Sequence, residues 1–184
     1  GSEMCIRDRN GAWDEGGLTQ DANIVLNECA GVLQYAQTVF EGLKAYTTSD
    51  GRTVVFRPDL NGERLEQSAA RLEMPIFPKE RFVEAIKQVV KANEAYVPPY
   101  GSGATLYLRP YMFGSNPVIG VKPASEYQFR IFATPVGPYF KGGAKPITIR
   151  VCDFDRAAPN GTGHIKAGLN LSLIHISEPT RLRC

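Results

Sequence analysis

The stretch GVLQYAQTVFEGLKAY, from Gly31 to Tyr46, is rich in apolar and aromatic residues and precedes the turn sequence Ser49-Asp50-Gly51-Arg52. Thr53–Phe56, TVVF, is a short β-branched run on the other side of that turn. An Asp-Gly pair between two apolar runs is typical of a β-hairpin, because glycine adopts the backbone conformations that tight turns require. The stretch therefore predicts two antiparallel strands joined by a short turn.

Two helices and two longer strands are predicted after this hairpin. Pro58–Met74 carries apolar residues at helical spacing until Pro75, and Lys79–Tyr96 carries one apolar stripe. Ala104–Phe113 and Tyr127–Val136 alternate or run apolar with β-forming residues, which favours strands. The pattern predicts an α+β fold of strands and two helices.

A Pro- and Gly-rich stretch, Gly137–Ala144, predicts a domain boundary. We expect a small α+β domain over residues 10–140, followed over residues 141–170 by a linker and the start of a second domain. Ile147–Cys152 predicts the first strand of that domain. Ala157–Gly168 is a loop of small residues that carries one lysine, Lys166.

The sequences of the two ends of the chain indicate that these end segments do not come from the natural protein. Codons that can encode Gly1–Arg9 encode Leu171–Pro179 when they are read on the opposite strand. This pairing resembles a transposase adapter that was ligated to both ends of a genomic fragment and translated with it. We therefore expect residues 1–9 and 171–184 to be adapter-derived, and we leave them out of fold and function.

The composition excludes several classes of protein. The chain has 184 residues, of which 43% are hydrophobic, so it can bury a core. The formal net charge of +2 is too small to indicate a nucleic-acid or anionic-membrane partner, and no apolar run approaches the ~20 residues of a membrane span. We therefore expect a cytoplasmic protein. We also expect no metal site, because zinc-ligand spacing is absent from its four cysteines: Cys5, Cys29, Cys152 and Cys184.

The most pointed chemical feature is Lys166, which lies among small residues in the segment Asn160–Gly168, NGTGHIKAG. A lysine becomes a nucleophile when desolvation or nearby positive charge lowers its pKa, because the neutral amine then forms a Schiff base with a carbonyl. On residue type alone, a surface loop lysine is the commoner interpretation. Phosphate-loop and Ser/His/Asp patterns are absent from the sequence.

Three arginines stand in apolar or capped contexts: Arg57 before Pro58, Arg64 near the expected start of a helix, and Arg109 between two apolar residues. Arginine grips phosphate or carboxylate with two hydrogen bonds, and a helix start adds free N–H groups. Each arginine alone is more often part of a structural ion pair. The aromatic residues Tyr35, Phe40 and Tyr107 could equally belong to the core.

Five collinear motifs resemble a known family. They are QYAQTVFEGLKAY at Gln34–Tyr46, FRPDLNGERL at Phe56–Leu65, SAARLEMP at Ser68–Pro75, LYLRP at Leu106–Pro110 and RAAPNGTGHIKAGLN at Arg156–Asn170. In this order they resemble branched-chain amino-acid aminotransferases, which are pyridoxal-phosphate enzymes of fold type IV. The resemblance implies an N-terminal small domain with a mixed sheet and two helices. The resemblance covers essentially all of residues 10–170 and makes Lys166 a candidate catalytic residue.

The resemblance implies roles position by position. Lys166 would form the Schiff base with pyridoxal 5'-phosphate and shuttle the substrate proton, and Arg64 would grip the cofactor phosphate. Arg156 matches a recurrent arginine to which we assign no role. Substrate-pocket positions are matched by Tyr35, Phe40, Tyr107 and Arg109.

The implied reaction is transamination of leucine, isoleucine and valine with 2-oxoglutarate by a homodimer. Related fold type IV enzymes, a D-amino-acid aminotransferase or an aminodeoxychorismate lyase, are the alternatives, and a non-catalytic small-molecule or protein-binding domain is the alternative from another class. We expect the chain as written to comprise the small N-terminal domain plus the first strand and lysine loop of a truncated second domain. On that basis we also expect it to be inactive.

Overall fold

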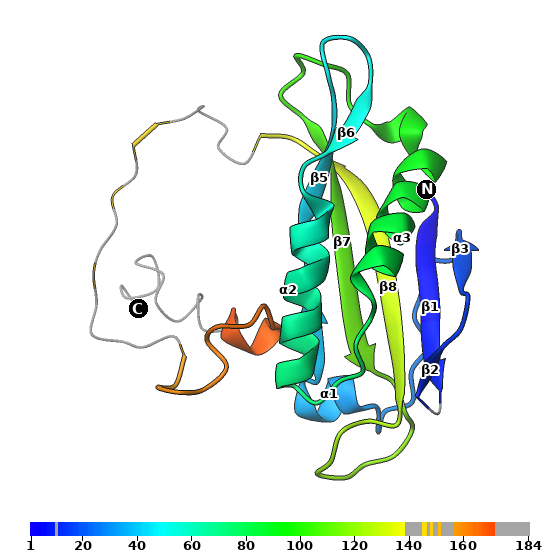
Figure 1. Ribbon diagram of the computed structural model, residues 1–184, viewed down its shortest axis with the longest axis vertical. Helices are drawn as coiled ribbons and strands as arrows, with labels where there is room; N and C mark the ends of the chain where they lie inside the picture. The colour runs from blue at the N-terminus through cyan, green and yellow to red at the C-terminus, as the bar shows by residue number, and fades with distance from the viewer. Residues whose placement is uncertain (10, 139–144, 147, 149–150, 152–156, 172–184) are drawn as a thin grey trace.

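The computed structural model describes residues 1–9, 11–138, 145–146, 148, 151 and 157–171 (Figure 1). Their helices and strands follow one another as β1 (Glu3–Arg9), β2 (Ala12–Trp13), β3 (Gly17–Thr19), α1 (Gly31–Tyr35), β4 (Thr38–Phe40), β5 (Leu43–Thr47), β6 (Thr53–Val55), α2 (Pro58–Arg71), α3 (Lys79–Ala92), η1 (Glu94–Tyr96), β7 (Thr105–Gly114), β8 (Glu126–Val136) and η2 (Gly168–Asn170). The α+β class is confirmed.

One sheet of eight strands forms the body of the fold, in the order β2-β1-β8-β7-β5-β6, with β3 beside β1 and β4 beside β7. All the strand pairs among the described residues are antiparallel, whereas a mixed sheet was expected. The predicted hairpin is present as β5 and β6, with Thr47 opposite Thr53. The long pair β7–β8 lies at the centre and supplies most of the core strand residues.

Both predicted helices, α2 and α3, cover the same face of the sheet (Figure 1). Proline at the first position of α2 suits a helix start, because its missing N–H has no partner there in any case. The apolar stripe of α3 packs on the central strands, and the ring of Phe82 lies 6.1 Å from that of Phe129 on β8. Fully buried residues on the two layers include Leu65, Phe82, Ile86, Leu108, Phe129 and Ile131.

A short helix, α1, interrupts the apolar stretch that opens the predicted hairpin. It ends at Ala36, whose φ of 53° turns the chain into β4. Gln37 then holds this turn in place: its side-chain amide donates to the Leu72 carbonyl and to the Tyr127 hydroxyl. The consequence is that β4 enters the sheet directly beside β7, with Phe40 opposite Tyr111.

The segment Glu3–Arg9, which we expected to be adapter-derived and outside the fold, forms strand β1 and pairs with β8. Alternate residues Met4 and Ile6 are apolar and buried, so the segment suits the open edge of β8. Residues 172–184, residues 139–144 of the predicted domain boundary and most of Ile147–Cys152 lie outside the described residues. The division into domains stays a prediction.

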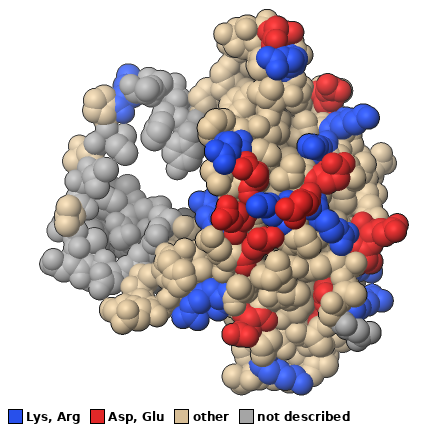
Figure 2. Space-filling view, in the orientation of Figure 1, with Lys and Arg blue, Asp and Glu red and all other residues tan. Residues whose placement is uncertain are grey.

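The surface of the helix face carries Lys/Arg and Asp/Glu side chains in a mixed arrangement, in line with the net charge of +2 (Figure 2). Across the described residues, none of the helices has the length and apolar character that crossing a membrane requires.

Candidate active site

Backbone hydrogen bonds attach the loop that carries Lys166 to helix α2 and strand β4. The Lys166 N–H donates to the Ser68 hydroxyl on α2 at 3.1 Å, and the Phe40 N–H donates to the Lys166 carbonyl at 3.2 Å. Ala167 forms an antiparallel bridge with Val39, so the loop extends the sheet beyond β4. Residues 157–171 accordingly lie beside α2 (Figure 1). The position of Lys166 is therefore set by β4 and α2.

Asn170 closes the same loop on itself. Its side-chain amide is buried and donates to the carbonyls of Thr162 and Ile165, at 2.7 and 2.9 Å. Ile165 and Ala167, the neighbours of the lysine, are both buried. The buried side chains of Ile165 and Ala167 and the hydrogen bonds of the Asn170 amide fix the backbone on both sides of Lys166. A fixed backbone is what a positioned amine requires.

The Lys166 amine meets an aromatic and cationic cluster. Its Nζ atom lies 4.6 Å from the centre of the Phe40 ring, and the Arg109 guanidinium carbon lies 4.6 Å from the same ring. Arg109 also donates from Nε and Nη2 to the Tyr107 hydroxyl, at 3.0 and 2.7 Å. Phe40, Tyr107, Arg109 and Lys166 are thus brought together from β4, β7 and the lysine loop.

The buried carboxylate of Glu41 binds Arg64, another of the predicted site residues. Glu41 is fully buried, and its two oxygens accept hydrogen bonds from Arg64 Nε and Nη2, each at 2.7 Å. The Asn61 amide donates to Glu41 Oε2 at 2.8 Å. The Arg64 side chain keeps half of its surface exposed, so the edge of the guanidinium that has no partner among the described residues is available to an anion.

A hollow of about 280 Å³ lies between Arg64 and the lysine loop. A guanidinium and an amine on one hollow suit a small molecule that carries both an anionic group and a carbonyl. Its lining comprises Arg64, His164, Ile165, Lys166, Ala167, Asn170 and Leu171.

The surroundings of Lys166 lower its pKa. Burial is the largest cause, because it penalises the charged ammonium; the positive charges of Arg64 and Arg109 act in the same direction, and the carboxylate of Glu41 opposes them. The same carboxylate raises the pKa of Arg64, mainly through its hydrogen bonds. The lysine therefore has a larger neutral, nucleophilic fraction than a solvated lysine has.

Two of the predicted site residues stand elsewhere, and one lies outside the described residues. Tyr35 ends α1 with 44% of its surface exposed, and none of the described contacts joins it to Lys166. Arg57 pairs with Asp59 at the surface, as a structural ion pair does. Arg156 falls in the part of the chain that the structure does not describe.

The expectation that Arg64 lies at a helix start was wrong. It occupies the second turn of α2, beyond the free N–H groups of the first turn, because the helix begins at Pro58. An anion at Arg64 is therefore held by the guanidinium.

Sequence reasoning missed Glu41, although a signal was present. Val39, Leu43 and Ala45 are buried and alternate along one face of the chain, and Glu41 falls in phase with them. A charge at an inward position of a strand requires a partner, because an unpaired buried carboxylate costs several kcal/mol. The phase of the alternation could have predicted a buried ion pair, but not that Arg64 supplies it.

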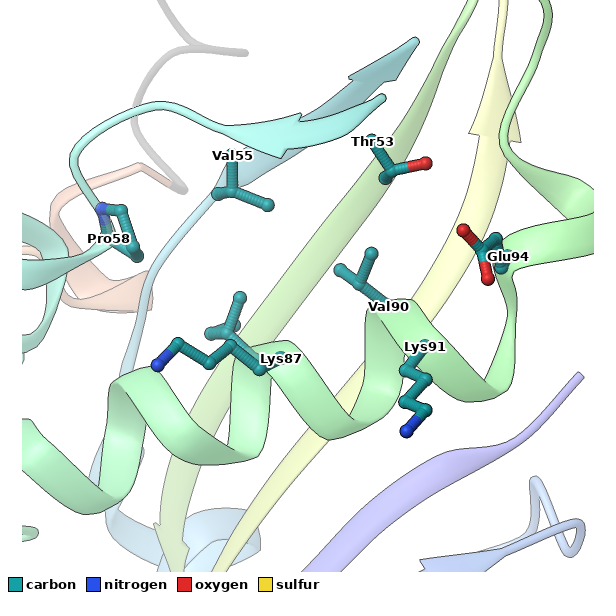
Figure 3. A pocket seen from close by; sticks show the side chains of 8 residues that line it. Thr53, Val55, Pro58, Lys87, Val90, Lys91 and Glu94 are labelled. Atoms are coloured by element: carbon teal, nitrogen blue, oxygen red, sulfur yellow. The ribbon is translucent and has the colours of Figure 1, made fainter. Parts of the chain in front are cut away.

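A larger hollow, of about 480 Å³, lies between β6 and α3 and holds none of the predicted site residues (Figure 3). Thr53, Val55 and Val90 line it, and Lys87 and Lys91 project from α3 beside it.

Comparisons with known proteins agree with the motifs, although no protein-family model matches the chain. A branched-chain-amino-acid aminotransferase of Haemophilus influenzae is 52% identical over 162 residues, which are 88% of this chain and 47% of that protein. The solved branched-chain aminotransferase of Thermoproteus uzoniensis with norvaline superposes with a TM-score of 0.69 at 25% identity, over 98% of this chain and 57% of that one. Another solved branched-chain amino acid aminotransferase, one with pyridoxamine 5'-phosphate, gives a TM-score of 0.55 at 27% identity, over 78% of this chain and 43% of that one.

The fold is that of the fold type IV aminotransferases. Within that class, the chain resembles the branched-chain-amino-acid aminotransferases, as the five motifs predicted. The chain spans about half the length of the curated relatives it matches.

Proposed function

We propose that the whole protein carrying this sequence transaminates branched-chain amino acids with pyridoxal 5'-phosphate, and that Lys166 is its catalytic lysine. One observation carries the proposal: the Lys166 amine, with its lowered pKa, shares the Phe40 ring with Arg109 beside a hollow that Arg64 lines. Amine, substrate-binding arginine and phosphate-binding arginine are the three groups that the reaction needs from this part of the fold.

The residues present fit the cofactor. Lys166 offers an amine that reacts with an aldehyde, and Arg64 offers a guanidinium edge in the same hollow for a phosphate. The solved relative with pyridoxamine 5'-phosphate supports this assignment. Bound pyridoxal phosphate would supply an electron sink for the negative charge that develops at the substrate Cα.

The chain's own residues would handle the substrate and its proton. The neutral Lys166 amine takes the Cα proton and returns it, as a general base and acid. Arg109, oriented by the Tyr107 hydroxyl, would hold the substrate carboxylate, and Phe40 would line the side-chain cavity. Selectivity among leucine, isoleucine and valine should be weak, because one methylene contributes only ~1–3 kcal/mol.

Chemical trapping tests the proposal. The whole protein is incubated with pyridoxal phosphate, reduced with borohydride and digested, and the labelled peptide is identified by mass spectrometry. We expect the label on Lys166, loss of the label in Lys166→Ala, and retention in Lys44→Ala, which removes a lysine from strand β5. A label on another lysine, or none, would disprove the assignment.

Substrate assays separate the proposal from its alternatives. L-Leucine should be turned over, whereas D-alanine would indicate a D-amino-acid aminotransferase and aminodeoxychorismate would indicate the lyase. No trapped adduct would favour a non-catalytic binding domain.

Two further features belong to the proposal: a homodimer and a cytoplasmic location. The position of Tyr35, exposed and apart from the Lys166 cluster, supports a homodimer in which both subunits contribute to each pocket.

A further inference from the structure

Glu41 stands behind the guanidinium of Arg64, on the side away from solvent. The carboxylate is fully buried, whereas the arginine side chain is half exposed. The two parallel hydrogen bonds, from Nε and Nη2, both measure 2.7 Å, which is the fork geometry that fixes the plane of a guanidinium. The orientation of Arg64 is therefore set from below by Glu41.

Glu41 is itself held in place by two hydrogen bonds from different elements. Its backbone N–H donates to the Pro110 carbonyl on β7 at 2.7 Å, and the Asn61 amide on α2 binds its Oε2 atom. Gly42 follows it with no side chain, and a Cβ there would come within 2.6 Å of the Tyr107 hydroxyl. The carboxylate is thus a rigid support that joins α2 to the central sheet.

The hydrogen bonds of Arg64 to described residues use only Nε and Nη2. This leaves Nη1 without a partner among those residues, on a side chain that lines the hollow with Lys166. A free arginine side chain loses rotamer entropy when it binds a ligand, and one that is already held loses less.

We propose that Glu41 is a positioning residue for the cofactor phosphate: it holds Arg64 so that the Nη1 edge of the guanidinium receives the phosphate group. The inference rests on the proposed function, in which Arg64 grips that phosphate. Glu41 does not touch the ligand; it acts through Arg64.

Removing the Glu41 charge has two opposing effects on phosphate binding. It frees the positive charge of Arg64, which strengthens attraction, and it frees the side chain to rotate, which weakens binding. Because the arginine is half exposed, solvent screens the first effect. The loss of orientation is the larger effect, so Glu41→Gln weakens phosphate binding.

The test compares ligands with and without a phosphate. Pyridoxal phosphate, pyridoxal and inorganic phosphate are titrated into the whole apo-protein and its Glu41→Gln, Arg64→Gln and doubly substituted variants. We expect Glu41→Gln to weaken binding of pyridoxal phosphate and of inorganic phosphate about tenfold, and not to weaken pyridoxal binding, because loss of the Glu41 charge lowers the pKa of Lys166 further. The double variant should bind no more weakly than Arg64→Gln, because both changes remove one interaction.

Glu63→Gln is the matched control, because it removes the same charge from an exposed position beside Arg64 on α2. It should leave all three affinities unchanged. Asn61→Ala is the second variant, in case Glu41→Gln does not fold: it keeps the charge and frees the carboxylate, and should weaken phosphate binding by a smaller factor.

Two results would overturn the inference: unchanged phosphate affinity in Glu41→Gln, or equal weakening for pyridoxal and pyridoxal phosphate, which indicates a purely structural residue. The proposed function fails separately. If borohydride traps no adduct on Lys166 while inorganic phosphate binding still depends on Glu41, the transamination proposal falls and the role of Glu41 stands.

Discussion

Phe40 and Lys166 contact each other twice: the Phe40 N–H donates to the Lys166 carbonyl at 3.2 Å, and the Lys166 amine lies 4.6 Å from the centre of the Phe40 ring. Phe40 therefore contacts both the backbone and the side-chain amine of the lysine. We expect Phe40→Leu to retain the backbone contact and lose the cation–π contact, which stabilises the charged ammonium, so that trapping of Lys166 by pyridoxal phosphate near neutral pH becomes about 2- to 5-fold faster. An unchanged trapping rate would show that the ring contributes nothing to the amine.

The lowered pKa of Lys166 predicts a pH-dependent stability. Between the folded pKa and the higher unfolded pKa, the unfolded chain binds more protons, so stability rises with pH there. The cost of burying the charged amine is present below the folded pKa and is relieved as pH rises through it. Lys166→Met should therefore raise Tm at pH 7, by a margin that shrinks towards pH 10. Lys87→Met, at an exposed lysine of α3, is the control in thermal melts.

The Glu41–Arg64 pair predicts an asymmetry in stability. Arg64→Ala leaves a buried carboxylate with Asn61 as its remaining side-chain donor, so it should lower the free energy of unfolding by about 2 kcal/mol. Adding Glu41→Gln to that variant should restore part of the loss, because no buried charge then remains unpaired. Urea denaturation of Arg64→Ala, Glu41→Gln and the double variant measures this, and additive losses would contradict it.

Asn170 predicts that the lysine loop opens as a unit. Asn170→Ala removes the donors to the Thr162 and Ile165 carbonyls, which are left without that partner. We expect faster hydrogen exchange across residues 161–168, by a factor of about ten or more, and unchanged exchange in β7. Equal acceleration in both regions would indicate global destabilisation instead.

The close approach of Gly42 to Tyr107 predicts that a larger residue at position 42 weakens substrate binding. A Cβ at this position would come within 2.6 Å of the Tyr107 hydroxyl, which must then move and lose its hydrogen bonds from Arg109. In the whole protein, Gly42→Ala should raise KM for the amino acid by about tenfold or more, which corresponds to the loss of one hydrogen bond to a charged group, and should lower kcat less than it raises KM. Gly137→Ala is the control, because a Cβ there meets no atom within 4 Å.

Much of the fold could be predicted from local patterns. The Asp-Gly turn predicted the β5–β6 hairpin, and helical spacing with Pro58 and Pro75 predicted α2. The helix α1 was missed because its five residues are too few to show a period. Strand direction could not be predicted in this way, because it depends on pairing between distant segments; the strand pairs among the described residues are antiparallel.

The site could be predicted only in part. Motif resemblance selected six residues, and the structure brings five of them together, namely Phe40, Arg64, Tyr107, Arg109 and Lys166. The sixth, Tyr35, lies apart from them. The partners Glu41 and Ser68 were not predicted, because each meets its site residue through a contact between segments 23 and 98 positions apart. Local periodicity contains no information about such contacts.

During translation, the residues that contact the lysine loop are synthesised before Lys166 itself. Val39 and Ser68 are made well before Lys166, and the contact from Ser68 spans 98 positions. At ribosomal speeds of about 5–20 residues per second, roughly 5–20 s pass between the two. The nascent chain thus contains both contact residues of the lysine loop several seconds before the ribosome adds the reactive amine.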